Sequence, residues 1–348
     1  MAAKGIYIYG VVPISYSENH FRSLKNSEIN FISFLDISAI VSNSDRAYLD
    51  FSDRESLARL LVHHQKTIED IMDNGFKMIL PMKLGTIVQT REEVLSILSK
   101  GYSLMKTTLM KIEHQTEFDL VVTWADFGKT IKEMADHPDI IALKDDILKN
   151  TDKVSPVDQI KVGMLFQQKL SEKNKEVELK VLESLSKFSI DIKIHEVMND
   201  QMVTNSAFLI NENSKERFEQ AIDQLDEEFE GFLRFKLVGP LPCYSFYTIE
   251  VEKFNLEHVA QAKEELGIRE EVSETELKKA YVGKAKLVHP DALPKNECDG
   301  NEDFNRINKA YHILLDYSLA ARQISKDKQF RSAKDKTREN LILVKIKE

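Results

Sequence analysis

The feature that most constrains this chain is a change of pattern near residue 258. Upstream, short runs of β-branched and aromatic residues alternate with amphipathic helical segments. From residue 258 to 320 strand patterns are absent, and three helical segments follow one another closely. At 348 residues the chain is also long enough for two or three domains. We therefore expect an α+β fold of two mixed α/β units followed by a small all-α helical hairpin.

The pattern predicts four segments: residues 1–135, 136–256, 257–320 and 321–348. The first is an α+β domain that ends on a strong strand, 117–124. The second is a helical connection followed by four short strands around one helix, which is typical of a ferredoxin-like unit. These four strands are expected at 190–197, 207–211, 232–238 and 245–251. The third segment is the helical module, and the fourth is a basic tail with a terminal strand.

The alternating stretch Leu341–Lys347 is the strand at the end of that tail. A strand that follows a helical module either pairs with an upstream strand or stays an exposed edge. We expect it to return to the α+β body.

Charge and composition exclude several classes of protein. The formal net charge is −9, with −11 on residues 1–257 and +5 on 321–348, so the body has no basic footprint for nucleic acid. No apolar run reaches the length of a membrane span, and the N-terminus does not resemble an export signal. Cys243 and Cys298 are the only cysteines, too few for a disulfide framework. We expect a folded cytoplasmic protein without nucleic-acid or membrane partners.

The helical module carries the sharpest motif. Ser273 and Glu276 have the spacing of a capping box at a helix start. Pro290 forces residue 289 out of helical space, so the helix ends there, and a second apolar stripe follows from Phe304. The pattern predicts an antiparallel αα-hairpin whose connection begins at an exposed His289-Pro290-Asp291. Its expected apolar core consists of Leu266, Leu277, Ala280, Phe304, Ile307, Ala310, Tyr311 and Leu314.

This module resembles a J-domain, the Hsp70-stimulating module of DnaJ-type co-chaperones. Leu266-Gly267-Ile268 matches the end of its first helix, 278–281 its second, 289–291 its signature loop and 304–316 its third helix. The resemblance implies that the loop docks on the Hsp70 nucleotide-binding domain, triggers ATP hydrolysis there, and is helped by the second helix. The implied docking residues are His289, Pro290, Asp291, Lys278, Lys279, Tyr281, Lys284 and Lys286.

Two observations bear on that resemblance. The second helix continues with Val282-Gly283-Lys284 where the family has two basic residues and a leucine, and a mid-helix glycine costs about 1 kcal/mol relative to alanine. A J-like hairpin that only docks remains the alternative. The tripeptide recurs as His137-Pro138-Asp139 without the flanking helices, and there it predicts a helix start.

Residues 1 to about 252 resemble the gas vesicle protein family GvpF/GvpL. The resemblance rests on several short segments that follow one another in the same order as in the family, among them 7–12, 80–86, 117–124 and 239–246. It implies an accessory protein of gas vesicle assembly that binds the apolar shell protein and other accessory proteins, at the gas vesicle.

No set of residues indicates an enzyme, a metal site or a cofactor. His63 and His64 are adjacent on a helix and point about 100° apart, so a buried His64 and a solvated His63 are expected instead of a metal site. Cys243 is expected to be packed and not nucleophilic, and Trp124 is expected in the core.

Three hypotheses therefore remain. The chain is a gas vesicle assembly factor with a working J-domain, a structural vesicle component with a docking-only hairpin, or a general DnaJ-type co-chaperone.

Overall fold

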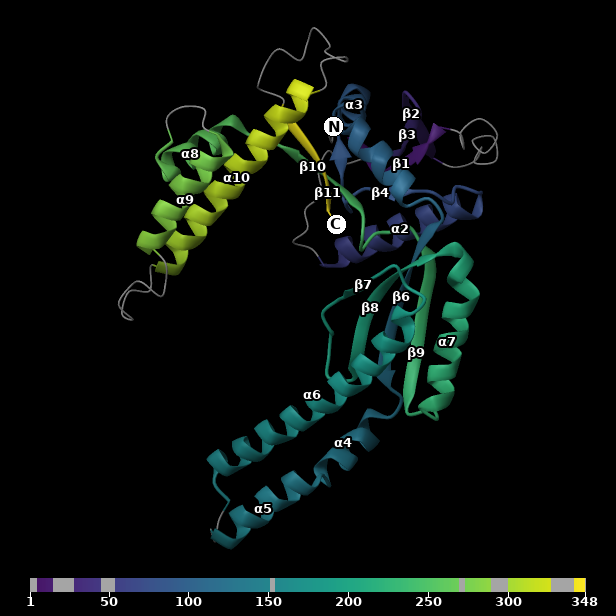
Figure 1. Cartoon of the computed structure of the whole chain (residues 1–348), viewed down its shortest axis with the longest axis vertical. Helices are drawn as coiled ribbons and strands as arrows, with labels where there is room; N and C mark the ends of the chain where they lie inside the picture. Colours follow the sequence, from purple (N-terminus) through teal and green to yellow (C-terminus); the bar gives the residue numbers. More distant parts are fainter. Residues whose placement is uncertain are drawn as a thin grey trace. The chain divides into compact units, whose positions relative to one another are not determined.

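The computed structural model of the chain describes residues 5–14, 28–44, 54–150, 154–268, 273–288, 300–326 and 341–347. They form two compact units, shown in Figure 1: Met1–Lys111 together with Tyr247–Lys347, and Ile112–Phe246. None of the helices in these ranges combines the length and the apolar character needed to cross a bilayer.

The first unit is built on a five-stranded antiparallel sheet around β1 (Gly5–Pro13). The sheet runs β2 (Ile29–Phe34), β3 (Ile37–Ser44), β1 and β4 (Leu80–Pro81), and β5 (Ile87–Val88) also pairs with β1. Successive side chains of a strand point to opposite faces. Because β1 is buried along almost its whole length, its sequence is nearly continuously apolar.

Two long helices pack in this unit, α2 (Arg54–Asp73) and α3 (Arg91–Lys111). His64 of α2 lies against Tyr7 and Tyr9 of β1. The apolar face of α3 contacts β1 to β4. The expected helices and strands of this region are therefore present.

A second, two-stranded sheet in the first unit joins distant parts of the chain. β10 (Thr248–Lys253) pairs antiparallel with β11 (Ile342–Lys347), and Lys253 lies opposite Ile342. β11 also packs on α3, where a Cβ at Gly101 would lie 2.7 Å from a methyl group of Val344. The terminal strand returns to the α+β body, as predicted.

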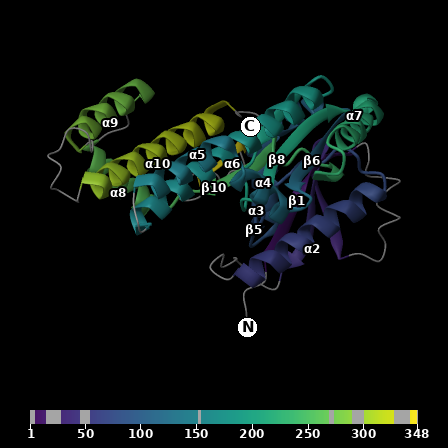
Figure 2. The ribbon, with the colours of Figure 1, turned by 90° about the horizontal axis from the view of Figure 1, so that it is seen from below.

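Three helices lie between these two paired strands: α8 (Leu256–Leu266), α9 (Glu274–Val288) and α10 (Gly300–Lys326). Both α8 and α9 pack on α10 (Figure 2). Because Lys253 and Ile342 are partners in the sheet, the helical module is an insertion between neighbouring strands.

The second unit has the βαββαβ order of a ferredoxin-like fold. Its four-stranded antiparallel sheet has the order β7-β8-β6-β9, and its helices are α4 to α7. The elements are β6 (Gln115–Trp124), α4 (Phe127–Ala135), α5 (Pro138–Asn150), α6 (Pro156–Ser186), β7 (Asp191–Ile194), β8 (Met202–Asn211), α7 (Lys215–Glu228) and β9 (Leu233–Leu241), with a short 3-10 turn at Glu212–Ser214.

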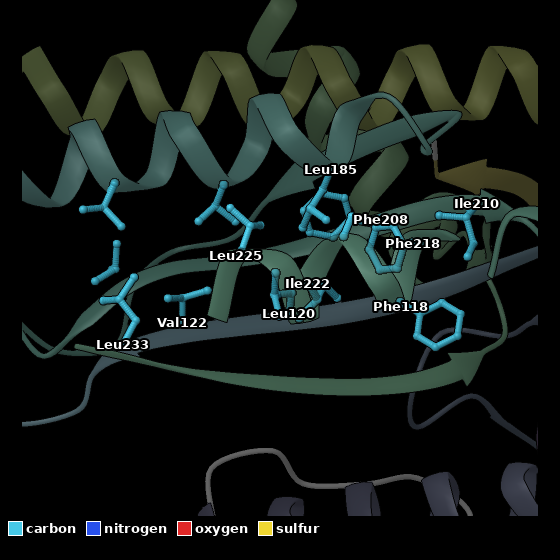
Figure 3. Close-up of a cluster of buried hydrophobic side chains, with 14 of the residues drawn as sticks. Phe118, Leu120, Val122, Leu185, Phe208, Ile210, Phe218, Ile222, Leu225 and Leu233 are labelled. Carbon is cyan, nitrogen blue, oxygen red and sulfur yellow. The ribbon is translucent and has the colours of Figure 1, made fainter. Parts of the chain in front are cut away.

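The core of the second unit lies between this sheet and helices α6 and α7 (Figure 3). Phe118, Leu120 and Val122 alternate along β6 and point to the helices. They meet Leu185 of α6 and Phe218 of α7, and Trp124 belongs to the same core, as expected.

The predicted fold class is confirmed, but the strands are divided differently. β6 is a central strand of the ferredoxin-like sheet, although the sequence placed it at the end of the first segment. The strand expected at 245–251 instead pairs with β11 in the first unit. Local patterns show that a strand exists but not its partner, because pairing depends on contacts far apart in sequence. The four-segment domain division stays a prediction.

Gly239 provides a test of close packing in the second unit. Its φ is +150°, and a Cβ would lie 2.6 Å from the ring of Phe118 and 2.9 Å from the carbonyl oxygen of Glu117. We expect Gly239→Ala to lower the free energy of unfolding by about 2–4 kcal/mol, because backbone strain and collision add. Gly231→Ala is the control, since its φ is +75° but nothing lies within 4 Å of the added atom. Equal losses in urea unfolding would contradict the collision argument.

Candidate functional site

The candidate site is the three-helix module of the first unit, and its helix ends follow from local sequence. Asn255 caps α8, whose C-terminal Gly267 adopts a left-handed φ of 71°. At the start of α9, Glu276 Oε2 accepts hydrogen bonds from Ser273 N at 2.8 Å and from Ser273 Oγ at 2.7 Å. These bonds lower the pKa of Glu276. The capping pair places α9 where the sequence predicts it.

The module has a core of its own. Leu266 of α8, Leu277 of α9 and Ile307 of α10 are each at most 5% exposed and lie in one cluster. Ala310 and Leu314 are buried in it too, while Ala280 and Tyr311 pack against it. Phe304, also predicted for this core, is half-buried. Val259 and Ala262 of α8 and Ile268 just after it complete the cluster, and the first two were not among the predicted core residues.

Tyr281 links α9 to α10. Its ring stacks on Tyr311 at a centroid distance of 4.4 Å, and its hydroxyl donates to Asn308 Oδ1 at 3.4 Å. Glu274 at the start of α9 pairs with Arg322 near the end of α10 at 3.1 Å. The two helices are therefore antiparallel. The ring of Tyr281 is engaged within the hairpin, so any docking contact has to come from its remaining exposed edge.

The α9 lysines form an uneven surface. Lys278, Lys279, Lys284 and Lys286 are all exposed. Residues three, four, seven and eight apart share a helix face, so Lys278, Lys279 and Lys286 lie on one side around Val282. Lys284 points elsewhere: its Cε lies 3.9 Å from the position of a Cβ on Gly267, at the end of α8. The structure brings together three of the four predicted lysines.

The signature loop lies outside the described residues. His289, Pro290 and Asp291 follow directly on Val288, where α9 ends. The second copy of the tripeptide is described and behaves as predicted: α5 begins at Pro138. Asp139 there pairs with Lys169 of α6 at 2.8 Å, so that copy has a structural role.

The module is attached to the first unit by contacts that sequence reasoning missed. Lys345 Nζ of β11 lies 2.9 Å from Glu252 of β10 and 3.2 Å from Asp316 of α10. Ala320 is fully buried against Leu341 and Leu343. The helix α10 runs to Lys326, six residues past the predicted end of the module, and Asp316 and Ala320 make these contacts from the part before that end. The alternating apolar residues of 341–347 were the available signal.

A buried carboxylate in the second unit has a strongly raised pKa. Glu117 is 1% exposed and accepts hydrogen bonds from the backbone and the hydroxyl of Ser245, each at 2.8 Å. Burial, with the charge of Asp119, raises the pKa of Glu117 to about 8. Asp119 Oδ1 is buried without a hydrogen-bond partner, and burial also raises the pKa of that side chain. Glu117 thus holds the segment after β9 in place and is structural.

We expect this site to make stability pH-dependent. The pKa of Glu117 is about 8 in the folded chain and 4.5 ordinarily. Between those two pH values the folded chain therefore binds more protons than the unfolded chain. The stabilisation is complete below the ordinary pKa and is lost as pH rises through about 8. Glu117→Gln keeps the shape and removes the charge. In this variant Tm should fall less above neutral pH than in the parent chain. At alkaline pH its free energy of unfolding should exceed that of the parent chain by about 1–3 kcal/mol. Glu196→Gln is the control, because Glu196 is exposed and its replacement should leave the dependence of Tm on pH unchanged. If the Tm of the parent chain does not change between neutral and alkaline pH, the raised pKa of Glu117 is contradicted.

Other residues singled out in the sequence are also structural. His64 is 3% exposed, its Nδ1 lies 2.9 Å from Tyr7 Oη, and burial lowers its pKa to about 4. His63 is exposed, as expected. Cys243 is 2% exposed, and burial raises its pKa to about 12, so the thiol is unreactive at neutral pH. Within the described residues no group of three metal-binding side chains comes together.

Comparison with known proteins matches both parts of the architecture. The family model described as gas vesicle synthesis protein GvpL/GvpF covers residues 5–248, and the DnaJ domain model covers residues 264–322. Gas vesicle protein F from Nostoc sp. (strain PCC 7120) is 23% identical over 71% of this chain and 99% of its own length. Gas vesicle protein F from Dolichospermum flosaquae is 23% identical over 70% and 98%.

The helical module has relatives of its own. Chaperone protein DnaJ from Thermoplasma volcanium is 41% identical over 51 residues, which are 15% of this chain and 14% of that protein. The likeness is thus confined to the J-domain.

Solved structures agree with the fold of the body. The crystal structure of GvpF from Anabaena sp. PCC7120 superposes with a TM-score of 0.56 at 20% identity, covering 70% of this chain and 95% of the other. That of GvpF from Microcystis aeruginosa gives 0.56 at 20% identity over 69% and 98%.

Fold and motif together define the class: a gas vesicle protein with a co-chaperone module inserted near its C-terminal strand. Since the first family model covers well over half of the residues, the chain belongs to the GvpL/GvpF family.

Proposed function

We propose that this protein is a non-enzymatic accessory factor of gas vesicle assembly that holds the apolar shell protein and recruits an Hsp70 through its J-domain. It acts in the cytoplasm, at the growing gas vesicle, together with other accessory proteins. A shell subunit that lines a gas phase exposes apolar surface before it assembles and is prone to aggregate. A holder that brings an ATP-driven chaperone to the same subunit would couple capture to release.

The observation that carries this proposal is the fusion itself. A gas vesicle family body and a J-domain with its own core and an exposed basic helix occur in one chain. In this proposal the loop residues His289, Pro290 and Asp291 dock on Hsp70. Lys278, Lys279 and Lys286 supply the electrostatic contact. Lys284 and Tyr281 are secondary contributors. Lys284 lies apart from the other three lysines, and the ring of Tyr281 stacks on Tyr311.

The experiment is co-expression of the full chain with the shell protein encoded by the same organism. The proposal expects the shell protein to stay soluble and to co-purify with the chain, and the cognate Hsp70 to join this complex in the presence of ATP. An unrelated chemically denatured protein serves as the comparison client. Equal binding of both clients would favour a general DnaJ-type co-chaperone and contradict the proposal.

A docking-only hairpin is the second candidate, and one observation favours it. α9 carries an exposed Gly283, with no atom within 4 Å of an added Cβ, where the J-domain pattern has a basic residue. In that case Hsp70 would bind without faster ATP hydrolysis, and the complex would still form.

A further inference from the structure

Among the strands that the structure describes, β7 and β9 are the edges of the ferredoxin-like sheet, whose order is β7-β8-β6-β9 (Figure 1). An edge strand presents backbone N–H and C=O groups that can bond to a strand of another chain. The two edges of this sheet differ in how strongly they prevent such pairing.

The β9 edge carries features that hinder pairing with a second copy. Pro240 lies within the strand and has no N–H group to donate to a further strand. Arg234 and Lys236 are both exposed, and residues two apart point to the same face of a strand. A copy of this edge laid against it would bring like charges together, which is a means of keeping edges apart.

The β7 edge offers backbone groups for pairing. In an antiparallel ladder only alternate residues bond to a given neighbouring strand. Just after β7, His195 N donates to Asn205 O of β8 at 2.7 Å. The alternation therefore turns the backbone groups of Ile192 and Ile194 to the open edge. In agreement with this direction, Ile192 N donates to Asp191 Oδ1, a side chain of its own strand, at 2.8 Å.

One face of β7 presents a row of isoleucines. Ile190, just before the strand, and Ile194, at its end, are 53% and 54% exposed. Ile192 lies between them on the same face, is half-buried and packs against the core of the unit. A strand added at this edge would cover both exposed isoleucines and extend the apolar row across the contact.

The other face of β7 carries one charge of each sign, Asp191 and Lys193, on either side of Ile192. Among the described residues neither charge forms an ion pair. Asp191 Oδ1 accepts the hydrogen bond from Ile192 N, and Lys193 Nζ lies 5.6 Å from the ring centroid of Phe246. Both charged groups are thus available to a partner strand of complementary charge.

These charges select a second copy of the same strand in a single register. A two-fold axis through Ile192 places Asp191 of each copy opposite Lys193 of the other, and it places Ile190 opposite Ile194. An axis through Asp191 or through Lys193 would place like charges opposite each other. With the axis at Ile192, its N–H faces the C=O of Ile192 in the other copy. The Asp191 carboxylate is then released to pair with Lys193 across the contact.

We propose that two copies of this chain pair antiparallel through their β7 edges, so that two four-stranded sheets become one continuous sheet. The contact is isologous, with isoleucines meeting on one face and opposite charges meeting on the other. The inference goes beyond the proposed function and does not depend on shell-protein binding or on Hsp70.

Sedimentation equilibrium of the full chain tests the dimer at low ionic strength, because salt screens exposed charge pairs. The edge is short, so we expect a dissociation constant of about 100 μM. Asp191→Lys and Lys193→Asp each place like charges opposite at both ends of the contact, and each should weaken the dimer about tenfold. Mixed in equal amounts, the two variants present opposite charges to each other again and should associate as the parent chain does.

A control variant and hydrogen exchange locate the contact. Lys236→Asp reverses an exposed charge on the β9 edge of the same sheet and should leave the dimer unchanged. In the parent chain the amides of Ile192 and Ile194 should exchange more slowly at about 300 μM than at about 1 μM. Amides of β9 should exchange at the same rate at both concentrations.

Four results would overturn the proposal. The first is a parent chain that stays monomeric at about 300 μM. The second is a mixture of the Asp191→Lys and Lys193→Asp variants that associates no better than either variant alone. The third is a dimer that Lys236→Asp weakens as much as Asp191→Lys does. The fourth is a monomer whose Ile192 and Ile194 amides are protected by the shell protein, which would assign the β7 edge to that partner.

Discussion

His289→Gln is expected to reduce the stimulation of a cognate Hsp70 ATPase to the basal rate, a loss of about tenfold or more. In the J-domain resemblance the loop after α9 is the group that triggers hydrolysis, while the lysines of α9 contribute attraction. The substitution leaves Lys278, Lys279 and Lys286 unchanged, and with them the core residues Leu277 and Ile307. Binding should therefore weaken less than stimulation. Single-turnover ATP hydrolysis and a parallel binding measurement distinguish the two effects.

The chain supplies a matched control in its second tripeptide. His137→Gln changes the same residue type before the same Pro-Asp pair, but that copy starts α5, where Asp139 is paired with Lys169. Stimulation should stay at the level of the parent chain. If both variants stimulate Hsp70 equally, the loop is not the trigger. If the parent chain binds Hsp70 but does not accelerate its ATP hydrolysis, the hairpin only docks on Hsp70.

Val344→Asp should cause the largest loss of stability among the single substitutions considered, about 3–5 kcal/mol, because it leaves a carboxylate buried without a partner. Val344 is 0% exposed and lies against Gly101 of α3. The charge should displace β11 and with it the contacts of Ala320 and Asp316 that attach the J-domain. Thermal unfolding and hydrogen exchange of β10 and the end of α10 measure the effect.

Lys347→Asp is the control on the same strand. Lys347 is exposed, so the charge change there should alter stability by less than about 0.5 kcal/mol. Faster exchange in α10 after Val344→Asp but not after Lys347→Asp would confirm that β11 anchors the module. Unchanged exchange in β10 after Val344→Asp would contradict the described pairing.

The helices and most strands could be predicted because their signals are local. The Ser273–Glu276 capping box and the alternating residues of β11 need only neighbouring residues to be recognised. The ferredoxin-like unit was also expected, yet β6 was placed outside it. Its membership depends on pairing with β8 and β9, whose residues lie roughly 80 to 120 positions further along the chain.

The candidate site divides in the same way. The apolar positions of α9 and α10 are evident from helical spacing, and Leu277 and Ile307 do lie in one core. Spacing did not show that Lys284 points toward Gly267, nor that Tyr281 stacks on Tyr311. Lys345 joins Glu252 to Asp316 across about 30 to 90 residues of chain. Such a contact follows from the return of β11 and has no pattern of its own in the sequence.

The insertion of the J-domain between β10 and β11 sets an order of events during synthesis. A ribosome makes the chain from its N-terminus, and domains generally fold as they emerge. β10 emerges first, then α8 to α10, and only afterwards the strand that pairs with β10. The nascent body therefore keeps one strand edge uncovered until the helices of the J-domain have left the exit tunnel. Under the function proposed above, Hsp70 would bind these helices on the translating ribosome before β11 covers that edge.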